Sequence, residues 1–193
     1  MYTMVKSSSG ITLVPVESRL LSERKLFLEG EIGAGMACEF VRAIMLLSTE
    51  EPNKPIDVYV DSPGGEVNAG LVIYDTLKGM KTEVNLHCVG MAASMAAIIM
   101  AGGEKGHRYI LPHSRMMIHE PLIAGGVGGS ATTIKRTAES ILETKRITVE
   151  LLAKETGRTE KEVEEAIAFD NFMNAKEAIA FGLCDSIEES LIG

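Results

Sequence analysis

The spacing of apolar residues alternates along this chain between the period of a strand and the period of a helix. Apolar side chains recur at every second position in 56–60 and then at the spacing of one helix face in 67–77. The same succession is predicted twice more, with a strand at 25–28 before a helix at 36–47 and a strand at 84–89 before a helix at 91–101. Strands that alternate with helices of these lengths form βαβ units, so the pattern predicts an α/β fold around a mostly parallel sheet.

The C-terminal half of the chain departs from this alternation. The elements expected there are, in order, short strands at 108–111 and 115–119, a glycine-rich stretch at 124–129, and helices at 130–156, after Thr159 and after Asn174. The helix at 130–156 is longer than a small core needs, so we expect it to project. Because neither an internal repeat nor a linker is evident, residues 1–193 are expected to form a single domain.

Charge, cysteine content and histidine spacing exclude several classes of protein. The net charge of −8 disfavours binding to a phosphate backbone, so no nucleic acid partner is expected. The cysteines lack a C-x-x-C spacing and no two histidines have the H-x-x-x-H spacing of a helix-borne zinc site, so neither disulfides nor a metal is expected. Reduced thiols and the absence of an N-terminal targeting signal predict a cytoplasmic location.

One uncharged segment is long enough to be tested as a membrane span. Residues 84–103 carry no formal charge, and about 20 apolar residues can cross a bilayer. Val84, Leu86 and Cys88 alternate with polar residues as in a strand, and Gly90 then interrupts the run. The pattern therefore predicts a strand followed by a buried helix of small residues, and no membrane partner.

Two residues stand where an α/β fold often places catalytic groups. Ser94 lies among small residues at the predicted change from strand to helix, and His119 ends a predicted strand just before Pro121. A serine acts as a nucleophile when a nearby base takes its proton. A serine at a helix start is equally an ordinary capping residue, and the G-x-S-x-G motif is absent, so the residues alone leave both interpretations open. His87 is expected on the surface of its strand.

Local pattern does not choose the remaining members of such a site. An aspartate that orients the histidine would have to be one of Asp57, Asp61, Asp75, Asp170 and Asp185. The turn Ser62-Pro63-Gly64-Gly65 lies between a strand and a helix, where free N–H groups can face an anion, but any tight turn has this composition.

Taken together, five motifs carry a resemblance to a known family. They are the stretches at 18–21 (SRLL), 61–65 (DSPGG), 90–96 (GMAASMA), 111–121 (LPHSRMMIHEP) and 170–175 (DNFMNA). In this order and spacing, the sequence resembles the proteolytic subunits of the Clp protease, the ClpP family, over residues 12–188.

The resemblance implies a crotonase-like αβ spiral with a projecting handle helix. Residues of about 1–16 would form an axial segment, and those of about 122–156 the handle region. The protein would be an ATP-dependent Clp protease proteolytic subunit, a serine endopeptidase acting on unfolded proteins inside two stacked heptamers of one chain. A separate AAA+ unfoldase would supply the substrate, and no cofactor is implied.

The resemblance also implies a role for each residue of the site. Ser94 would be the nucleophile, His119 the general base and acid, and Asp170 the group that orients the imidazole. The N–H groups of Gly65 and Met95 would form the oxyanion hole. Gly125, Gly126 and Val127 belong to a stretch, 125–129, that matches the strand aligning the peptide by main-chain pairing.

The sequence departs from the family at four places. Glu120 stands where glutamine is usual, the stretch 123–130 is longer and richer in glycine, and residues 1–10 match the axial loop poorly. Ala168 and Phe169 replace a charged pair that joins the rings, so apolar burial is expected to hold them. Two alternatives remain open: a weakly active subunit of a mixed ring, and an acyl-CoA hydratase or isomerase of the crotonase fold.

Overall fold

A sheet of seven strands forms the centre of the protein. The structure is a computed structural model, and it describes residues 1–8, 10–123 and 125–191. The strands of the sheet are β3 (Lys25–Glu29), β4 (Ile56–Ser62), β5 (Val84–Ala93), β6 (Arg108–Ile110), β7 (Arg115–Ile118), β8 (Asn171–Asn174) and β9 (Ser186–Ile187). All the pairs are parallel except β7 with β8. The structure confirms the predicted α/β fold around a mostly parallel sheet.

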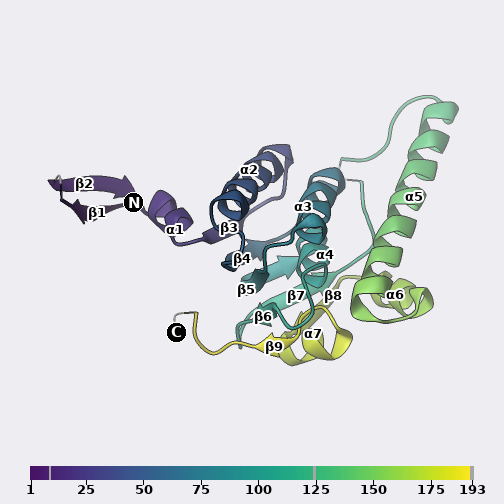
Figure 1. The fold of residues 1–193 in the computed structure, drawn as a ribbon. Coiled ribbons are helices and arrows are strands. Elements are labelled where there is room, and N and C mark those ends of the chain that lie inside the picture. Colours follow the sequence, from purple (N-terminus) through teal and green to yellow (C-terminus); the bar gives the residue numbers. More distant parts are fainter. Residues whose placement is uncertain (9, 124, 192–193) are drawn as a thin grey trace.

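Helices α2 (Ala34–Glu50), α3 (Val67–Gly79) and α4 (Met95–Ala101) cover one face of this sheet (Figure 1). Alternate strand residues turn toward these helices because successive side chains of a strand point to opposite faces. Leu28, Val58 and Leu86 are at most 1% exposed for this reason. The apolar periodicity that predicted these elements therefore marks the main core of the protein.

The opposite face carries a row of aromatic rings across neighbouring strands. Phe27, Tyr59, His87 and Tyr109 occupy paired positions, with successive ring centroids 5.0, 4.9 and 5.1 Å apart. The expectation that His87 lies on the strand surface is wrong, since only 6% of the residue is exposed. Its two flanking tyrosine rings exclude solvent, and this depends on strands that are distant in sequence.

The border between β5 and α4 also differs from the sequence prediction. The strand was expected to end at 89 and the helix to begin at 91, but β5 continues to Ala93 and α4 begins at Met95. Residues 91–93 stay extended because they pair with Arg115–Met117 of β7. The uncharged stretch 84–103 is thus divided between a strand and a short helix. Within the described residues, no helix has the length and apolarity needed to cross a bilayer.

The long helix α5 (Ala131–Thr156) confirms the predicted helix at 130–156, with Ser130 as its N-cap. Its second half packs on the body through the buried residues Thr148, Val149, Leu152 and Glu155, whereas its first half projects (Figure 1). Helices α6 (Glu160–Ile167) and α7 (Ala175–Phe181) begin with the expected capping boxes at Thr159 and Asn174. Both N-terminal caps are local, which explains why the sequence reveals them.

The N-terminal elements were not predicted. Strands β1 (Tyr2–Ser7) and β2 (Gly10–Pro15) form an antiparallel hairpin that extends away from the sheet, followed by α1 (Val16–Ser22) (Figure 1). Met4, Ile11 and Leu13 on this hairpin are more than 60% exposed. A two-stranded hairpin by itself is marginally stable in water, and here α1 packs against both of its strands.

Candidate active site

Ser94 occupies a strained turn between β5 and α4. Its backbone has φ 55° and ψ −122°, a combination that non-glycine residues rarely adopt. The Ser94 N–H donates to the carbonyl oxygen of Met117 at 2.8 Å, and the C=O accepts from Ala97 N–H at 3.0 Å. These bonds hold the backbone on both sides of the turn. Ser94 is left partly exposed between the buried residues Ala93 and Met95.

His119 follows β7 and reaches Ser94 because β7 runs parallel to β5. Met91 pairs with Arg115 and Ala93 pairs with Met117, so the C-terminal ends of the two strands lie at the same edge of the sheet. His119 Nε2 lies 2.9 Å from Ser94 Oγ, which is hydrogen-bond distance. The imidazole is therefore placed to accept the hydroxyl proton of Ser94.

Asp170 is brought to His119 by the antiparallel pairing of β8 with β7. Ile118 and Asn171 are partners in this pairing, so the residues that follow Ile118 and precede Asn171 lie close together. Asp170 Oδ1 is 3.5 Å from His119 Nδ1, and 65% of the Asp170 side chain is exposed. Of the aspartates left open by the sequence, Asp170 is the one that contacts His119 in the described part of the chain.

Two hydrogen bonds fix the turn that carries Asp170. The Glu120 N–H donates to the Ile167 carbonyl oxygen at 2.9 Å. The Asn171 side-chain amide donates to the Ala166 carbonyl oxygen at 3.1 Å. Each bond joins a residue next to His119 or Asp170 to the C-terminal end of α6. The sequence did not identify Asn171 as part of the site, because its partner is a backbone carbonyl group, and every residue has one.

The glycine pair after β4 packs directly against the Ser94 turn. A Cβ atom added to Gly64 would lie 2.7 Å from Ser94 Cβ, and one added to Gly65 would lie 2.1 Å from the Ile32 carbonyl oxygen. Both glycines also have positive φ, at 93° and 153°, so larger residues are excluded here. Among the described residues, the N–H groups of Gly65 and Met95 have no hydrogen-bond acceptor. Two free N–H groups thus occur in segments that meet at Ser94.

The glycine-rich stretch does not form the strand that was expected. Residues 121–123 and 125–130 are irregular, and Ala124 lies outside the described residues. Gly125 and Gly126 have φ values of 84° and 80°, which form a turn rather than extended backbone. Within the described chain, no hydrogen bond joins them to Ser94 or His119. Consecutive glycines have little intrinsic preference for a strand, because they have no side chains to pack against neighbouring strands.

An open cleft of about 520 Å³ lies beside the His119–Asp170 pair. It is lined by His119, Glu120, Pro121, Leu122, Ile167, Ala168, Phe169 and Asp170. Phe169 is 86% exposed at its rim, and Leu122 is 66% exposed. The Glu120 carboxylate accepts a bond of 2.6 Å from Lys145 Nζ, which ties this cleft to α5. The cleft combines an apolar wall with the polar groups of the site.

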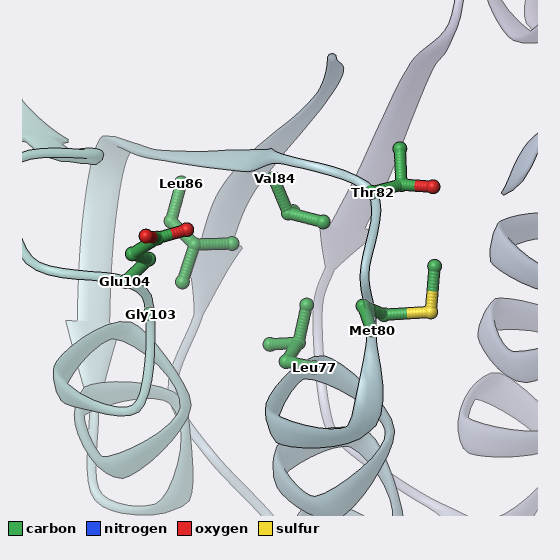
Figure 2. Close-up of a pocket in the computed structure, with 7 residues that line it drawn as sticks. All are labelled: Leu77, Met80, Thr82, Val84, Leu86, Gly103 and Glu104. Carbon is green, nitrogen blue, oxygen red and sulfur yellow. The ribbon is translucent and has the colours of Figure 1, made fainter. Parts of the chain in front are cut away.

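A second cavity lies at the opposite end of β5 and takes no part in this site. It has a volume of about 40 Å³, and Figure 2 shows its lining from the end of α3, the start of β5 and the segment after α4. The lining residues are Leu77, Met80, Thr82, Val84, Leu86, Gly103 and Glu104. A space of this size has room for about one or two water molecules but not for a substrate. Elsewhere in the described chain, no three His, Cys, Asp or Glu side chains come together as a metal site requires.

Comparison with known protein families gives one match that extends over nearly the whole chain. The family model described as Clp protease matches residues 8–190. The matched range includes β2, the seven-stranded sheet, the projecting helix α5 and every residue of the candidate site.

Proposed function

The chain belongs to the Clp protease family, a family of serine peptidases, and we propose that Ser94, His119 and Asp170 carry out its hydrolysis of peptide bonds. The single observation that carries this proposal is the 2.9 Å contact between Ser94 Oγ and His119 Nε2. The strained backbone of Ser94 supports it, because strain of this kind is concentrated at functional sites.

The first half of the reaction forms an acyl-enzyme. His119 Nε2 takes the Ser94 hydroxyl proton while Ser94 Oγ bonds to the carbonyl carbon of the scissile peptide. The N–H groups of Gly65 and Met95 donate hydrogen bonds to the oxygen that becomes negative. When the tetrahedral intermediate collapses, the C–N bond breaks and His119 gives its proton to the departing amine.

The second half of the reaction releases the acyl group. A water molecule gives a proton to His119 as its oxygen attacks the ester carbon, and the same two N–H groups stabilise the second oxyanion. His119 then returns the proton to Ser94 Oγ, and the carboxyl product leaves. Asp170 stabilises the charged imidazole in both halves and selects the tautomer with a proton on Nδ1.

Labelling with a fluorophosphonate tests this proposal directly. The probe should form one covalent adduct per chain, and the adduct should map to the peptide that contains Ser94. The variants Ser94→Ala and His119→Ala should not be labelled. Ser140→Ala serves as the control because Ser140 lies exposed on α5, and it should be labelled like the original protein. Labelling at another serine would refute the assignment of the nucleophile.

The same probe separates the alternatives. An acyl-CoA hydratase or isomerase needs no activated serine, and membership of the Clp protease family disfavours this alternative. A weakly active ring subunit would label slowly at Ser94 and hydrolyse few peptides per labelled site. We propose the active peptidase because the Ser94–His119 contact is at hydrogen-bond distance.

For the substrate and partners, we propose that unfolded proteins are supplied by a separate AAA+ unfoldase to a cytoplasmic double ring. Two stacked heptamers of a 20.8 kDa chain would have a mass of about 290 kDa. The projecting half of α5 supports contacts between the rings, because Ile134 and Leu142 on it are 46% and 65% exposed. Gly125, Gly126 and Val127 would pair with the peptide main chain. Light scattering and peptide hydrolysis with and without an unfoldase test these proposals.

A further inference from the structure

Strand β5 leaves its register with β4 shortly before Ser94. Val60 of β4 pairs with Cys88 of β5, but Ser62 pairs with Ala92. Asp61 alone therefore faces the three residues 89–91. This is a β-bulge, and bulges near active sites redirect the strand that contains them.

The exposed side chain of Asp61 spans the bulge and contacts its backbone. Asp61 Oδ1 accepts a hydrogen bond from the Met91 N–H at 2.9 Å, which replaces the lost ladder contact. The backbone of Gly90 packs against the same carboxylate, since a Cβ atom added there would lie 2.5 Å from Oδ1. Asp61 is itself held by β3, because it pairs with Glu29 and its C=O accepts from the Gly30 N–H at 2.9 Å. The carboxylate thus connects a firmly paired strand to the bulge.

At this bulge the pairing partner of β5 changes from β6 to β7. Up to Cys88, β5 pairs with β6, and from Met91 it pairs with β7. Strand β7 is the one that leads to His119, and its Met117 carbonyl accepts from the Ser94 N–H. Strand β6 ends at Ile110, so the bulge coincides with the point where β5 passes to the strand that leads to His119.

We propose that Asp61 is a positioning residue: its carboxylate holds the bulge in β5 that places Ser94 and the Met95 N–H against His119. This role rests on the proposed function, in which Ser94 is the nucleophile. Asp61 does not touch the reacting atoms, and what it supplies is a hydrogen-bond acceptor at a fixed position. An asparagine has a side-chain oxygen at the same place, so the role requires the acceptor rather than the negative charge.

The test compares variants of Asp61 in the assembled protein. Asp61→Ala removes the acceptor and should lower both the rate of fluorophosphonate labelling at Ser94 and kcat by about 10- to 100-fold, with little change in KM, because a misplacement of about 1 Å costs this much. Asp61→Asn should stay within about threefold of the original protein. Asp57→Ala is the matched control, because Asp57 lies on the same strand but bonds to Asn85 and His87, in the part of β5 away from Ser94. It should label normally.

A second variant that disrupts the same contact between Asp61 and Met91 keeps the proposal testable if Asp61→Ala does not fold. Gly90→Ala leaves Asp61 in place but pushes its carboxylate away from Met91, so it should also slow labelling. Where both single variants fold, the double variant should be no slower than the worse of them, because both break one interaction. Light scattering and the unfolding midpoint report whether each variant is intact.

The outcomes distinguish this role from the proposed function on which it rests. If the original protein is not labelled at Ser94, the proposed function fails. If the original protein is labelled and Asp61→Ala is labelled equally fast, the positioning role fails alone. The positioning role also fails if Asp61→Asn is as slow as Asp61→Ala, or if the effects of Asp61→Ala and Gly90→Ala multiply.

Discussion

Asp170 Oδ1 lies 3.5 Å from His119 Nδ1, beyond the usual length of a hydrogen bond between nitrogen and oxygen. The Asp170 side chain is 65% exposed, so water competes for the carboxylate in the single chain. A carboxylate orients an imidazole best when solvent is excluded, because the lower dielectric strengthens the contact. Ring assembly over the exposed Phe169 beside Asp170 would provide that exclusion. In the double ring proposed above, the strength of this contact would therefore depend on assembly.

Replacing Ser94 by alanine should abolish peptide hydrolysis and leave assembly unchanged. The substitution removes one hydroxyl among small side chains, so packing is hardly altered, whereas loss of a catalytic triad member typically costs of order 10⁴- to 10⁶-fold in rate. Hydrolysis of a fluorogenic peptide, measured together with the particle mass, checks this. Residual hydrolysis near that of the original protein would show that another residue is the nucleophile.

Asp170→Asn should lower the maximum rate of hydrolysis by up to about 10⁴-fold, because the amide cannot stabilise the imidazolium and favours the wrong tautomer. A pH–rate profile measures this effect: the maximum rate should fall, whereas the profile should not simply shift along the pH axis. Asp75→Asn is the control, since Asp75 is exposed on α3, and it should leave the profile unchanged. An unchanged plateau in Asp170→Asn would remove Asp170 from the mechanism.

The proposed double ring should persist at high salt. Burial of a side chain such as Phe169, now 86% exposed, contributes about 1.5–3 kcal/mol and is not screened, whereas a surface ion pair contributes about 0–1 kcal/mol and weakens with salt. Light scattering across a salt series should show that the particle formed by Phe169→Arg dissociates more readily with salt than that of the original protein. The particle formed by Phe169→Leu should resist salt as well as the original does. If the original particle splits into heptamers as salt rises, charges hold the rings together instead.

The stability contributed by His87 should decrease as the pH rises. Burial between Tyr59 and Tyr109 opposes the charged form, but the hydrogen bonds to Asp57 and Glu188 outweigh it and raise the pKa of His87. A raised pKa in the folded state means that this contribution is complete below the unfolded pKa of about 6.5 and is lost as the pH rises through the folded pKa.

Thermal unfolding of His87→Gln measures this effect. The difference in unfolding midpoint between the original protein and His87→Gln should be larger at pH 6 than at pH 9. His113→Gln is the matched control, because His113 is exposed in the turn before β7 and forms no ion pair with the described residues. A difference that stays constant or grows at high pH would contradict the predicted sign.

The three cysteines should differ in reactivity. Burial raises the pKa of the Cys88 thiol to about 11 and that of Cys184 to about 12, so neither forms the reactive thiolate near neutral pH. Cys38 is exposed and free. Iodoacetamide at pH 8 should therefore modify Cys38 first in the native protein, and all three cysteines after unfolding. Mass spectrometry of the native protein would contradict this if it found an adduct on Cys88 or Cys184.

Much of the secondary structure could be predicted because its signals are local. The signals of a helix, its apolar stripe and its caps, lie within its own segment. The alternation through 25–77 shows the stripes, and Thr159 and Asn174 show the caps. The α/β class follows from this order of elements. Strands β8 and β9 were missed because each is too short to show a period, and both exist through pairing with β7 and β6.

The candidate site, too, could be predicted from the sequence only in part. The sequence by itself identified Ser94 and His119 as polar groups at the ends of apolar segments, and its family motifs singled out Asp170 among the aspartates. Tertiary structure decided what these groups contact. The parallel pairing of β5 with β7 brings His119 to Ser94, and the pairing of β8 with β7 brings Asp170 to His119. Periodicity within one segment reports only which side chains are buried, whereas distances between side chains depend on hydrogen bonds between strands far apart in the chain.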